Sequence, residues 1–587
     1  MTAAETAPRA GSDTARSSIC LAILGSGGAG SMTAAGLLLE AAGRCGWYGL
    51  MTRSVGPQIR GGEAAAFVRL ATHPVECMDD RFDAVIAIDW NKADRFADEI
   101  VLDADSLVIG DPGLGAAPEI MTASGAGLVE VEMKALAKQI PDGRPNMIAL
   151  GIAAGLVGIG EPELDRVMVE RLGAKGEAAV ESSRSAVAAG REHARAMGRR
   201  LNLAASEAPG AARWSLTGNE ATGLGAVRGG VRFAAAYPIT PATEILEWLT
   251  PALRQVGGVL VQAEDELASV NMIIGASYGG TPALTATSGP GLALMVEALG
   301  LATAAEIPIV VVDVMRAGPS TGIPTKSEQA DLNIAVYGCH GDAPHVVVAP
   351  LSVADCLFTT QWAVHLAESM QTPAIVLSDQ FLGQTQAVIE PPAPVSFLTR
   401  REAPVAGGAP GSYRRYAQAA NSVSPMAIPG TAGGQYTADG LTHDDKGTPS
   451  SRTGDHARQL DKRHDKIATY DYGSHWAEVE GDGEFVLLTW GSLSGAAAEA
   501  AHRLAQDGIP ARTVAVRLIA PLKRDELIAA LGQRKVLVIE QSHSGQFERY
   551  LRAHAVLGGA VRTLRRPGPL PIRPGEICSA IHAWRQS

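Results

Sequence analysis

The chain has 587 residues and a formal net charge of −12; 46% of its residues are apolar, 19% are charged and 66 are glycine. This composition excludes a mainly disordered or fibrous protein, and the net negative charge argues against nucleic-acid binding as the main function. The six cysteines form no CxxC pair, which argues against an iron–sulfur cluster or zinc site held by this chain alone and indicates a reducing compartment.

The amino-terminal segment, residues 1–17, contains acidic residues and lacks an apolar core, so it does not resemble a secretory signal. We predict a disordered tail there. The longest uncharged apolar stretch, residues 147–160, is too short and too rich in glycine to cross a bilayer. We therefore expect a cytoplasmic protein with no membrane span.

A first α/β domain is predicted over residues 18–175. An apolar run at 19–24 leads into a glycine loop and a helical segment at 31–42, with further strands expected at 84–88 and 106–109. This alternation of strands and helices is typical of a mostly parallel sheet. Residues 176–211, rich in Ala, Arg and Glu, predict a solvated helical linker.

The glycine loop, Gly25-x-Gly27-Gly28-x-Gly30, matches a dinucleotide-binding fingerprint and could admit a phosphate. The position after the second strand carries Arg53, where an acidic residue would favour NAD, so NADP or coenzyme A would suit it better. Arg60 lies close enough in sequence to join the same anion site. The alternative is a turn that only packs a helix onto a strand, with solvated arginines.

A second α/β block is predicted over residues 212–395, with strands at 231–236, 258–262, 283–287, 307–313 and 374–377. Residues 396–480 are dense in polar residues, Gly and Pro, and predict an irregular arm that wraps a partner or a neighbouring domain. A third α/β block follows at 481–587, with strands at 484–489, 511–516 and 536–539. The fold class is thus α/β with three domains.

Four motifs in the second block carry candidate chemistry. In Tyr237-Pro238-Ile239-Thr240-Pro241, Thr240 is expected to cap a helix, where its hydroxyl could also bind a ligand. The acids 264–266 either cap the next helix or include a buried carboxylate for acid–base work. A glycine loop follows at 287–291. Arg316 stands just beyond a strand end, where arginine can clamp a carboxylate.

Taken together in this order, these motifs closely resemble the α subunit of 2-oxoacid:ferredoxin oxidoreductases, in particular the 2-oxoglutarate-specific branch with a fused γ domain. The resemblance covers nearly the whole chain. It implies a γ domain at 18–175, a thiamine diphosphate pyrimidine-binding domain at 212–395 and a transketolase C-terminal-like domain at 481–587.

The resemblance also implies roles for individual residues. Glu266 would contact the aminopyrimidine ring of thiamine diphosphate, with Glu264 as the runner-up. Thr240 would hydrogen-bond near cofactor and substrate, and Arg316 would hold the substrate carboxylate. The cofactor-binding set is Tyr237, Pro238, Ile239, Thr240, Glu266, Ser288 and Gly289. Coenzyme A is expected near Gly27, Gly28, Arg53 and Arg60, and no metal ligand is expected on this chain.

A separate β subunit is also implied. Thiamine enzymes need a GDG motif followed by asparagine to hold Mg²⁺ and the diphosphate, but the GDG at 481–483 precedes its strand and has no asparagine downstream. The β subunit would supply that site and a [4Fe–4S] cluster, in an αβ or (αβ)₂ assembly. Ferredoxin is the expected acceptor; a flavoprotein subunit that passes electrons to NAD is the alternative.

The expected reaction is oxidative decarboxylation of 2-oxoglutarate with coenzyme A to succinyl-CoA, CO₂ and reduced ferredoxin. An aryl or branched-chain 2-oxoacid would use the same scaffold. Two further alternatives are an NADP-linked dehydrogenase that uses the glycine loop and a non-catalytic scaffold descended from the family.

Overall fold

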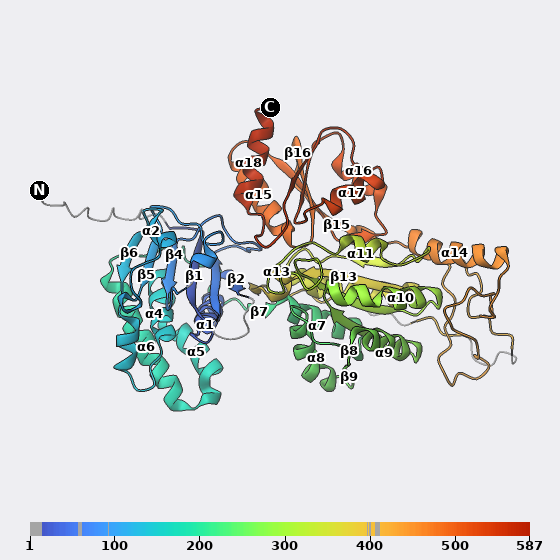
Figure 1. Ribbon diagram of the computed structural model, residues 1–587, viewed down its shortest axis with the longest axis horizontal. Coiled ribbons are helices and arrows are strands. Elements are labelled where there is room, and N and C mark those ends of the chain that lie inside the picture. The colour runs from blue at the N-terminus through green and yellow to red at the C-terminus, as the bar shows by residue number, and fades with distance from the viewer. Residues whose placement is uncertain (1–14, 57–61, 92, 396, 398–400, 405–410) are drawn as a thin grey trace, which may run out of the picture. The chain divides into compact units, whose positions relative to one another are not determined.

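The computed structural model describes residues 15–56, 62–91, 93–395, 397, 401–404 and 411–587 (Figure 1). The chain divides into two structural units. The first contains the chain up to Leu216 together with Thr385–Ala393 and Arg573–Gly575; the second contains Thr217–Gln384, Pro394–Ile572 and Glu576–Ser587. No helix among the described residues combines the length and apolar character needed to cross a membrane.

The first unit is built on a mixed eight-stranded sheet in the order β6-β5-β4-β1-β3-β2-β14-β7. Strands β1, β4, β5 and β6 run parallel, whereas β3 is antiparallel to β1 and to β2. The central β1 is buried on both faces, which explains its continuous apolar run. The strands are β1 (Ser18–Ser26), β2 (Tyr48–Val55), β3 (Glu63–Ala71), β4 (Ala84–Ala87), β5 (Leu107–Gly110), β6 (Gly127–Glu130), β7 (Trp214–Thr217) and β14 (Gln386–Ile389).

Strand β14 enters this sheet from more than 300 residues further along the chain. It pairs antiparallel with β2, with Gln386 opposite Met51. The predicted domain boundary at residue 395 therefore differs from the structure, because Thr385–Ala393 belong to the first unit.

The helices of the first unit are α1 (Ser31–Arg44), α2 (Glu119–Thr122), α3 (Met133–Lys138), α4 (Pro145–Val157), α5 (Glu161–Leu172) and α6 (Glu177–Ala196). Helices α4 and α6 lie side by side (Figure 1). Their axes approach closely at Gly190, where an added Cβ would lie 2.1 Å from the Ile148 carbonyl oxygen. Because α6 buries one face there, including Val180 and Val187, the predicted solvated linker is wrong for this helix.

The second unit contains a seven-stranded sheet in the order β18-β12-β13-β11-β10-β8-β9, parallel except for β18. Its strands are β8 (Phe233–Ala236), β9 (Val259–Gln262), β10 (Ala283–Thr287), β11 (Ile309–Met315), β12 (Val346–Val348), β13 (Pro373–Asp379) and β18 (Leu518–Ala520). The accompanying helices are α7 (Gly218–Gly229), α8 (Thr243–Gln255), α9 (Glu266–Tyr278), α10 (Gly289–Ala304), α11 (Leu332–Tyr337), α12 (Val353–Met370) and α13 (Gln380–Gln384).

A five-stranded sheet in the order β15-β17-β16-β19-β20 completes the second unit. It consists of β15 (Ala477–Glu480), β16 (Phe485–Trp490), β17 (Ala511–Val516), β19 (Lys535–Glu540) and β20 (Val561–Arg565), with helices α15 (Ser494–Gln506), α16 (Arg524–Leu531), α17 (Gln546–Ala553) and α18 (Pro574–Arg585). Buried side chains from both sheets form one continuous apolar core. The expected α/β fold class is confirmed.

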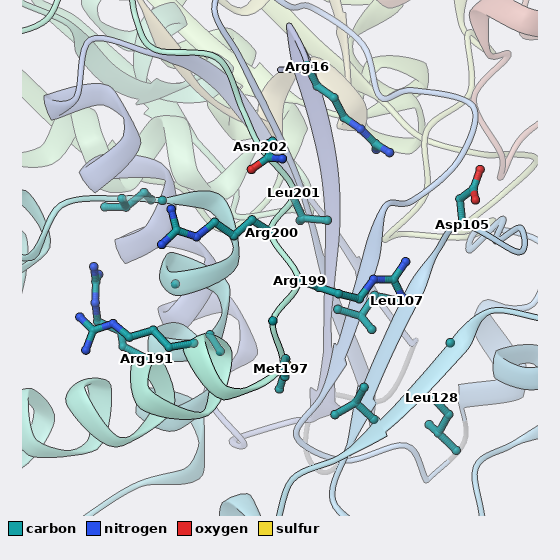
Figure 2. Close-up of a pocket in the computed structure, with 18 of the residues that line it drawn as sticks. Arg16, Asp105, Leu107, Leu128, Arg191, Met197, Arg199, Arg200, Leu201 and Asn202 are labelled. Atoms are coloured by element: carbon teal, nitrogen blue, oxygen red, sulfur yellow. The ribbon is translucent and has the colours of Figure 1, made fainter. Parts of the chain in front are cut away.

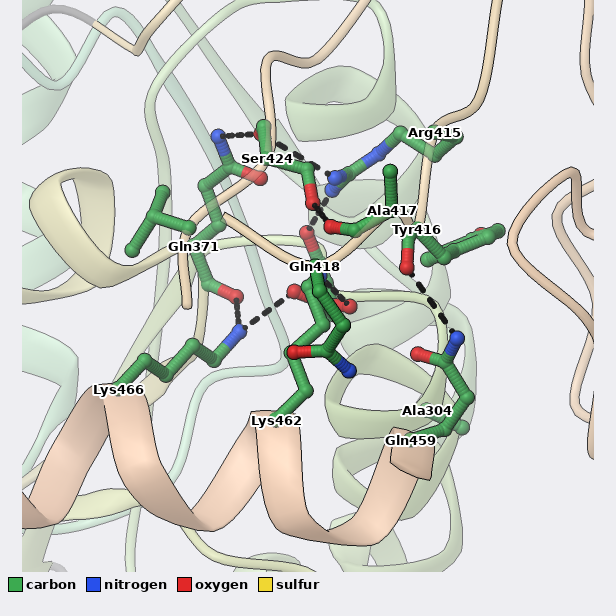
Figure 3. Close-up of polar contacts among 12 residues, drawn as sticks. Ala304, Gln371, Arg415, Tyr416, Ala417, Gln418, Ser424, Gln459, Lys462 and Lys466 are labelled. Atoms are coloured by element: carbon green, nitrogen blue, oxygen red, sulfur yellow. Dashed lines mark hydrogen bonds and ion pairs between the residues drawn. The ribbon is translucent and has the colours of Figure 1, made fainter. Parts of the chain in front are cut away.

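The predicted arm is only partly irregular. Its described residues up to 452 contain no helix or strand, but α14 (Thr453–Ala468) and β15 follow inside the predicted range. The arm packs on the second unit itself, since Lys462 Nζ and Lys466 Nζ donate to the Glu306 carboxylate at 2.6 and 2.9 Å. Arg415 Nη2 also donates to the Glu306 carbonyl oxygen at 2.8 Å. Figure 3 shows both lysines projecting from α14 into this cluster.

Candidate active site

The four sequence motifs meet at one edge of the seven-stranded sheet. They follow β8, β9, β10 and β11, which are parallel neighbours or next neighbours in the sheet. Ligands of such sheets bind at the carboxyl ends of the strands. The edge is therefore the first place to look for a functional site.

The acidic motif separates into three environments. Asp265 caps α9, because its Oδ1 accepts from the Ala268 N–H at 2.6 Å. Glu264 is exposed. Glu266, the first residue of α9, is only 8% exposed, and no described residue donates a hydrogen bond to its carboxylate. A largely buried glutamate whose carboxylate makes no hydrogen bond to the described chain is available to a ligand, so the geometry favours Glu266 over Glu264 as the functional acid.

The loop between β10 and α10 packs closely against the Glu266 carboxylate. A Cβ added at Gly291 would lie 2.0 Å from Thr287 Oγ1 and 2.7 Å from Glu266 Oε1, so only glycine fits there. Ser288, at the N-cap position of α10, is fully buried, and its Oγ has no hydrogen-bond partner in the described part of the chain. The loop thus presents a free hydroxyl beside an unpaired carboxylate.

Thr240 and Arg316 also contact each other, through the backbone of Thr240 rather than through its side chain. Helix α8 begins at Thr243 with Ala242 at the N-cap position, so the expected capping role of Thr240 is wrong. The Ile239 carbonyl oxygen instead accepts from the N–H groups of Ala242 and Thr243. Arg316 Nη1 donates to the Thr240 carbonyl oxygen at 2.7 Å, which ties the two motifs together.

The Arg316 guanidinium is largely removed from solvent. The residue is 6% exposed, and its Nε has no hydrogen-bond partner among the described residues. Burial lowers the pKa of Arg316, while the carboxylate of Asp331 opposes that shift. Of the remaining motif residues, Tyr237 is 42% exposed and Pro238 and Ile239 are half-buried, so this turn lies partly open to solvent.

The sequence motifs missed three acids near the same edge, of which Asp313 and Asp379 are buried and Asp331 is half-buried. Asp313 on β11 is fully buried, and burial together with the nearby Asp331 raises its pKa. Burial also raises the pKa of Asp331 to about 7 and that of Asp379, at the end of β13, to about 6. The available signal was a lone aspartate inside each of two apolar strands, β11 and β13.

In the first unit, the glycine loop follows β1. Gly28 and Gly30 have φ of 94° and 86°, in the left-handed region where glycine is favoured. Arg53 on β2 lies in register, across β3, with Ile23 on β1, so the structure brings Arg53 and the loop to the same end of the sheet. Arg60 lies outside the described residues.

A second anion-binding candidate in this unit was also missed. A pocket of about 920 Å³ lies beside the first residues of β5 and β6, at the strand ends opposite to the glycine loop. Arg199 and Arg200 make no hydrogen bond or ion pair within the described chain. Figure 2 shows this basic pocket, whose charged lining residues are Arg16, Asp105, Arg191, Arg195, Arg199 and Arg200. The excess of arginine suits a polyanionic group.

The described residues contain no group of three or more His, Cys, Asp or Glu side chains placed to hold a metal ion. The acids at the sheet edge are instead dispersed among hydroxyl groups and Arg316. Such a set can hold a heterocyclic ligand and a substrate carboxylate, and can transfer a proton.

Comparison with known families gives two matches along the chain. Residues 224–462 match the family described as pyruvate flavodoxin/ferredoxin oxidoreductase, thiamine diphosphate-binding. Residues 20–193 match the family described as pyruvate ferredoxin/flavodoxin oxidoreductase. The first match covers the edge that carries Glu266 and Arg316, and the second covers the glycine loop.

Individual relatives agree with these matches. The 2-oxoglutarate synthase subunit KorA of Methanothermobacter marburgensis is 35% identical over 373 residues, 62% of this chain and 97% of that protein. The 2-oxoglutarate oxidoreductase subunit KorA of Mycobacterium tuberculosis is 33% identical over 422 residues, 69% of this chain and 63% of that protein. A solved structure of 2-oxoglutarate:ferredoxin oxidoreductase from Magnetococcus marinus, with 2-oxoglutarate, coenzyme A and succinyl-CoA bound, is 34% identical with a TM-score of 0.89 and covers 97% of this chain and 99% of its own.

Proposed function

This chain belongs to the 2-oxoacid:ferredoxin oxidoreductase family, and from that premise we propose that it oxidatively decarboxylates 2-oxoglutarate with coenzyme A to succinyl-CoA and CO₂. It is a thiamine diphosphate-dependent oxidoreductase subunit. The choice of 2-oxoglutarate is supported by the names of its relatives and by the ligands of the Magnetococcus structure. The single observation that carries the catalytic proposal is the largely buried Glu266, whose carboxylate packs against Gly291 and makes no hydrogen bond to the described chain.

The residues at the sheet edge fit thiamine diphosphate. Glu266 offers a carboxyl group that no described residue engages, and Ser288 offers a free buried hydroxyl. When bound, thiamine diphosphate supplies the nucleophilic carbon and the electron sink that decarboxylation of a 2-oxoacid requires. In the proposed assignment Glu266 shares a proton with a ring nitrogen of the aminopyrimidine, while Tyr237, Pro238, Ile239, Thr240, Ser288 and Gly289 line the ring.

The Arg316 guanidinium supplies the positive charge for the substrate. We assign it to the substrate carboxylate, because its Nε is free and its Nη1 is already oriented by the Thr240 carbonyl oxygen. Burial strengthens such an interaction, since less water competes for the guanidinium. Thr240 is then placed to hydrogen-bond substrate or cofactor through its exposed side chain.

Coenzyme A is assigned to the first unit, at the glycine loop with Gly27, Gly28, Arg53 and Arg60. The basic pocket at the other end of the same sheet is the competing place for its phosphates. A β subunit supplies Mg²⁺, the diphosphate site and a [4Fe–4S] cluster in this proposal, in an (αβ)₂ assembly in the cytoplasm. Ferredoxin accepts the electrons; NAD through a flavoprotein subunit is the alternative.

The test uses the complex that co-purifies with this chain from its native host. Glu266→Gln should lower kcat by about 10²–10⁴-fold, the usual contribution of a positioned acid–base group, with the complex intact. Glu264→Gln, two residues away and exposed, is the matched control and should stay near wild type. Equal activity of both variants would overturn the assignment of Glu266.

Substrate choice needs a separate comparison. We expect kcat/KM for 2-oxoglutarate to exceed that for pyruvate, a branched-chain 2-oxoacid and an aryl 2-oxoacid, measured by reduction of an artificial electron acceptor. A higher kcat/KM for any of the others would refute the substrate and leave the family assignment in place.

A further inference from the structure

Two carboxyl groups near the loop between β10 and α10 have no role in the proposed chemistry. Asp313 is fully buried on β11, three residues before Arg316. Asp331, which is half-buried with its Oδ2 shielded from solvent, precedes α11 and packs against the loop between β10 and α10, since a Cβ added at Gly289 would lie 2.6 Å from its Oδ2. The two carboxyl groups are within hydrogen-bonding contact of each other.

Three oxygens of this pair receive no hydrogen bond from any other group in the described chain. Neither oxygen of Asp313 receives a hydrogen bond from an N–H or O–H donor, and neither does Oδ2 of Asp331. Two ionised carboxylates cannot hydrogen-bond to each other, and their like charges repel strongly when water is excluded. One proton shared between them removes the repulsion and satisfies an oxygen on each side.

The pair faces one positive and one negative group. Arg316 stabilises the ionised form of Asp331, whereas the half-buried Glu328 destabilises it. Burial raises the pKa of Glu328, and the nearby His543 opposes that shift. Glu266, the first residue of α9, packs against Gly291 rather than against the pair.

We propose that Asp313 and Asp331 hold one shared proton and that their single remaining negative charge positions Arg316 to bind the substrate carboxylate. The proposal rests on the proposed function of Arg316, and both aspartates are positioning residues. With one charge on the pair, Arg316 retains its attraction for the substrate carboxylate. Loss of the shared proton places a second negative charge beside Arg316, which repels the substrate carboxylate and competes for the guanidinium.

The first test is the pH dependence of KM in the purified complex. Burial raises the pKa of Asp331 to about 7, so the KM of the wild type for 2-oxoglutarate should rise about tenfold between pH ~6 and pH ~8, as for one group titrating near neutrality. Asp331→Asn keeps the shape and can donate an N–H to Asp313, but it has no proton to lose. Its KM should stay flat over this range, and a slope equal to that of the wild type would overturn the proposal.

Two further variants sharpen the test. Asp313→Asn exchanges the roles of the two groups and should also give a flat profile, which covers the case that Asp331→Asn fails to fold. Glu328→Gln removes the neighbouring negative charge and keeps the shared proton, so the rise of KM should remain but move to lower pH. A rise of KM in Asp313→Asn like that of the wild type, or an unmoved midpoint in Glu328→Gln, would contradict the model of one shared proton.

Thermal unfolding without substrate gives a readout independent of activity. Because the folded-state pKa of Asp331 lies above its unfolded value, this proton stabilises the wild type at low pH, and the stabilisation is lost as pH rises from about 4 to about 7. The unfolding midpoint of the wild type should therefore fall relative to that of Asp331→Asn across this window. If the midpoints of the two proteins change with pH in parallel, the shared proton is refuted. If the wild-type midpoint falls as expected but the complex is inactive, only the proposed function is refuted.

Discussion

Removing the Glu306 carboxylate tests the electrostatic anchor of the arm. Glu306 and Lys462 are fully buried and Lys466 is 1% exposed, with both ammonium groups donating to the same carboxylate. Glu306→Gln leaves one acceptor oxygen for two lysines and no countercharge. Breaking a buried ion pair in this way costs about 3–5 kcal/mol, because the remaining charge stays buried without compensation. For a unit of this size that corresponds to a fall in the unfolding midpoint of roughly 5 °C or more.

The pH dependence of this loss identifies its cause. Burial lowers the pKa of Lys466 to about 8 even with Glu306 present, and removing the carboxylate lowers that pKa further. The midpoint difference between Glu306→Gln and the wild type should therefore shrink as pH rises, because a neutral lysine needs no counterion. Scanning calorimetry of the full chain measures it, with the exposed Glu297→Gln on α10, the helix that ends just before Glu306, as the control. No difference at pH ~7, or a difference that grows with pH, would refute the reasoning.

Three further substitutions probe other parts of the molecule. Gly291→Ala places a methyl group within 2.7 Å of Glu266, so we expect thiamine diphosphate binding, measured by calorimetry of the complex, to weaken at least tenfold while circular dichroism stays unchanged. Gly190→Ala forces α6 away from α4 and should lower the unfolding midpoint by several degrees; an unchanged midpoint would contradict the close approach described above. Arg53→Ala should raise the KM for coenzyme A several-fold with kcat little changed, whereas the same rise in Arg199→Ala instead would move the phosphates to the basic pocket.

Local patterns in the sequence predicted several of the strands and the meeting of four motifs at one sheet edge. Strand β10 covers the predicted residues 283–287. The motifs that follow β8, β9, β10 and β11 meet because the carboxyl ends of neighbouring parallel strands lie at the same edge of the sheet. From the sequence, Arg316 and Thr240 could be associated only because their motifs follow strands that end at the same edge of the sheet. Their actual contact runs through the Thr240 backbone oxygen, which no side-chain pattern reports.

The features that sequence analysis missed depend on distant parts of the chain. Helix α6 was mistaken for a solvated linker because its buried positions are small residues such as Ala186 and Gly190, which give little apolar signal. Asp331 follows Asp313 by eighteen positions, so nothing local indicates that the two carboxyl groups meet. The cation cluster around Glu306 likewise joins residues about 160 positions apart.

The late insertion of β14 limits how the gene can be divided for expression. A recombinant fragment that stops at residue 211 contains every strand of the first unit's sheet except β7 and β14. Strand β2 would then expose an unpaired edge of eight residues, the kind of edge that promotes aggregation. A soluble fragment of this unit should therefore carry residues 385–393 on a short designed linker, which would restore the strand that normally pairs with β2.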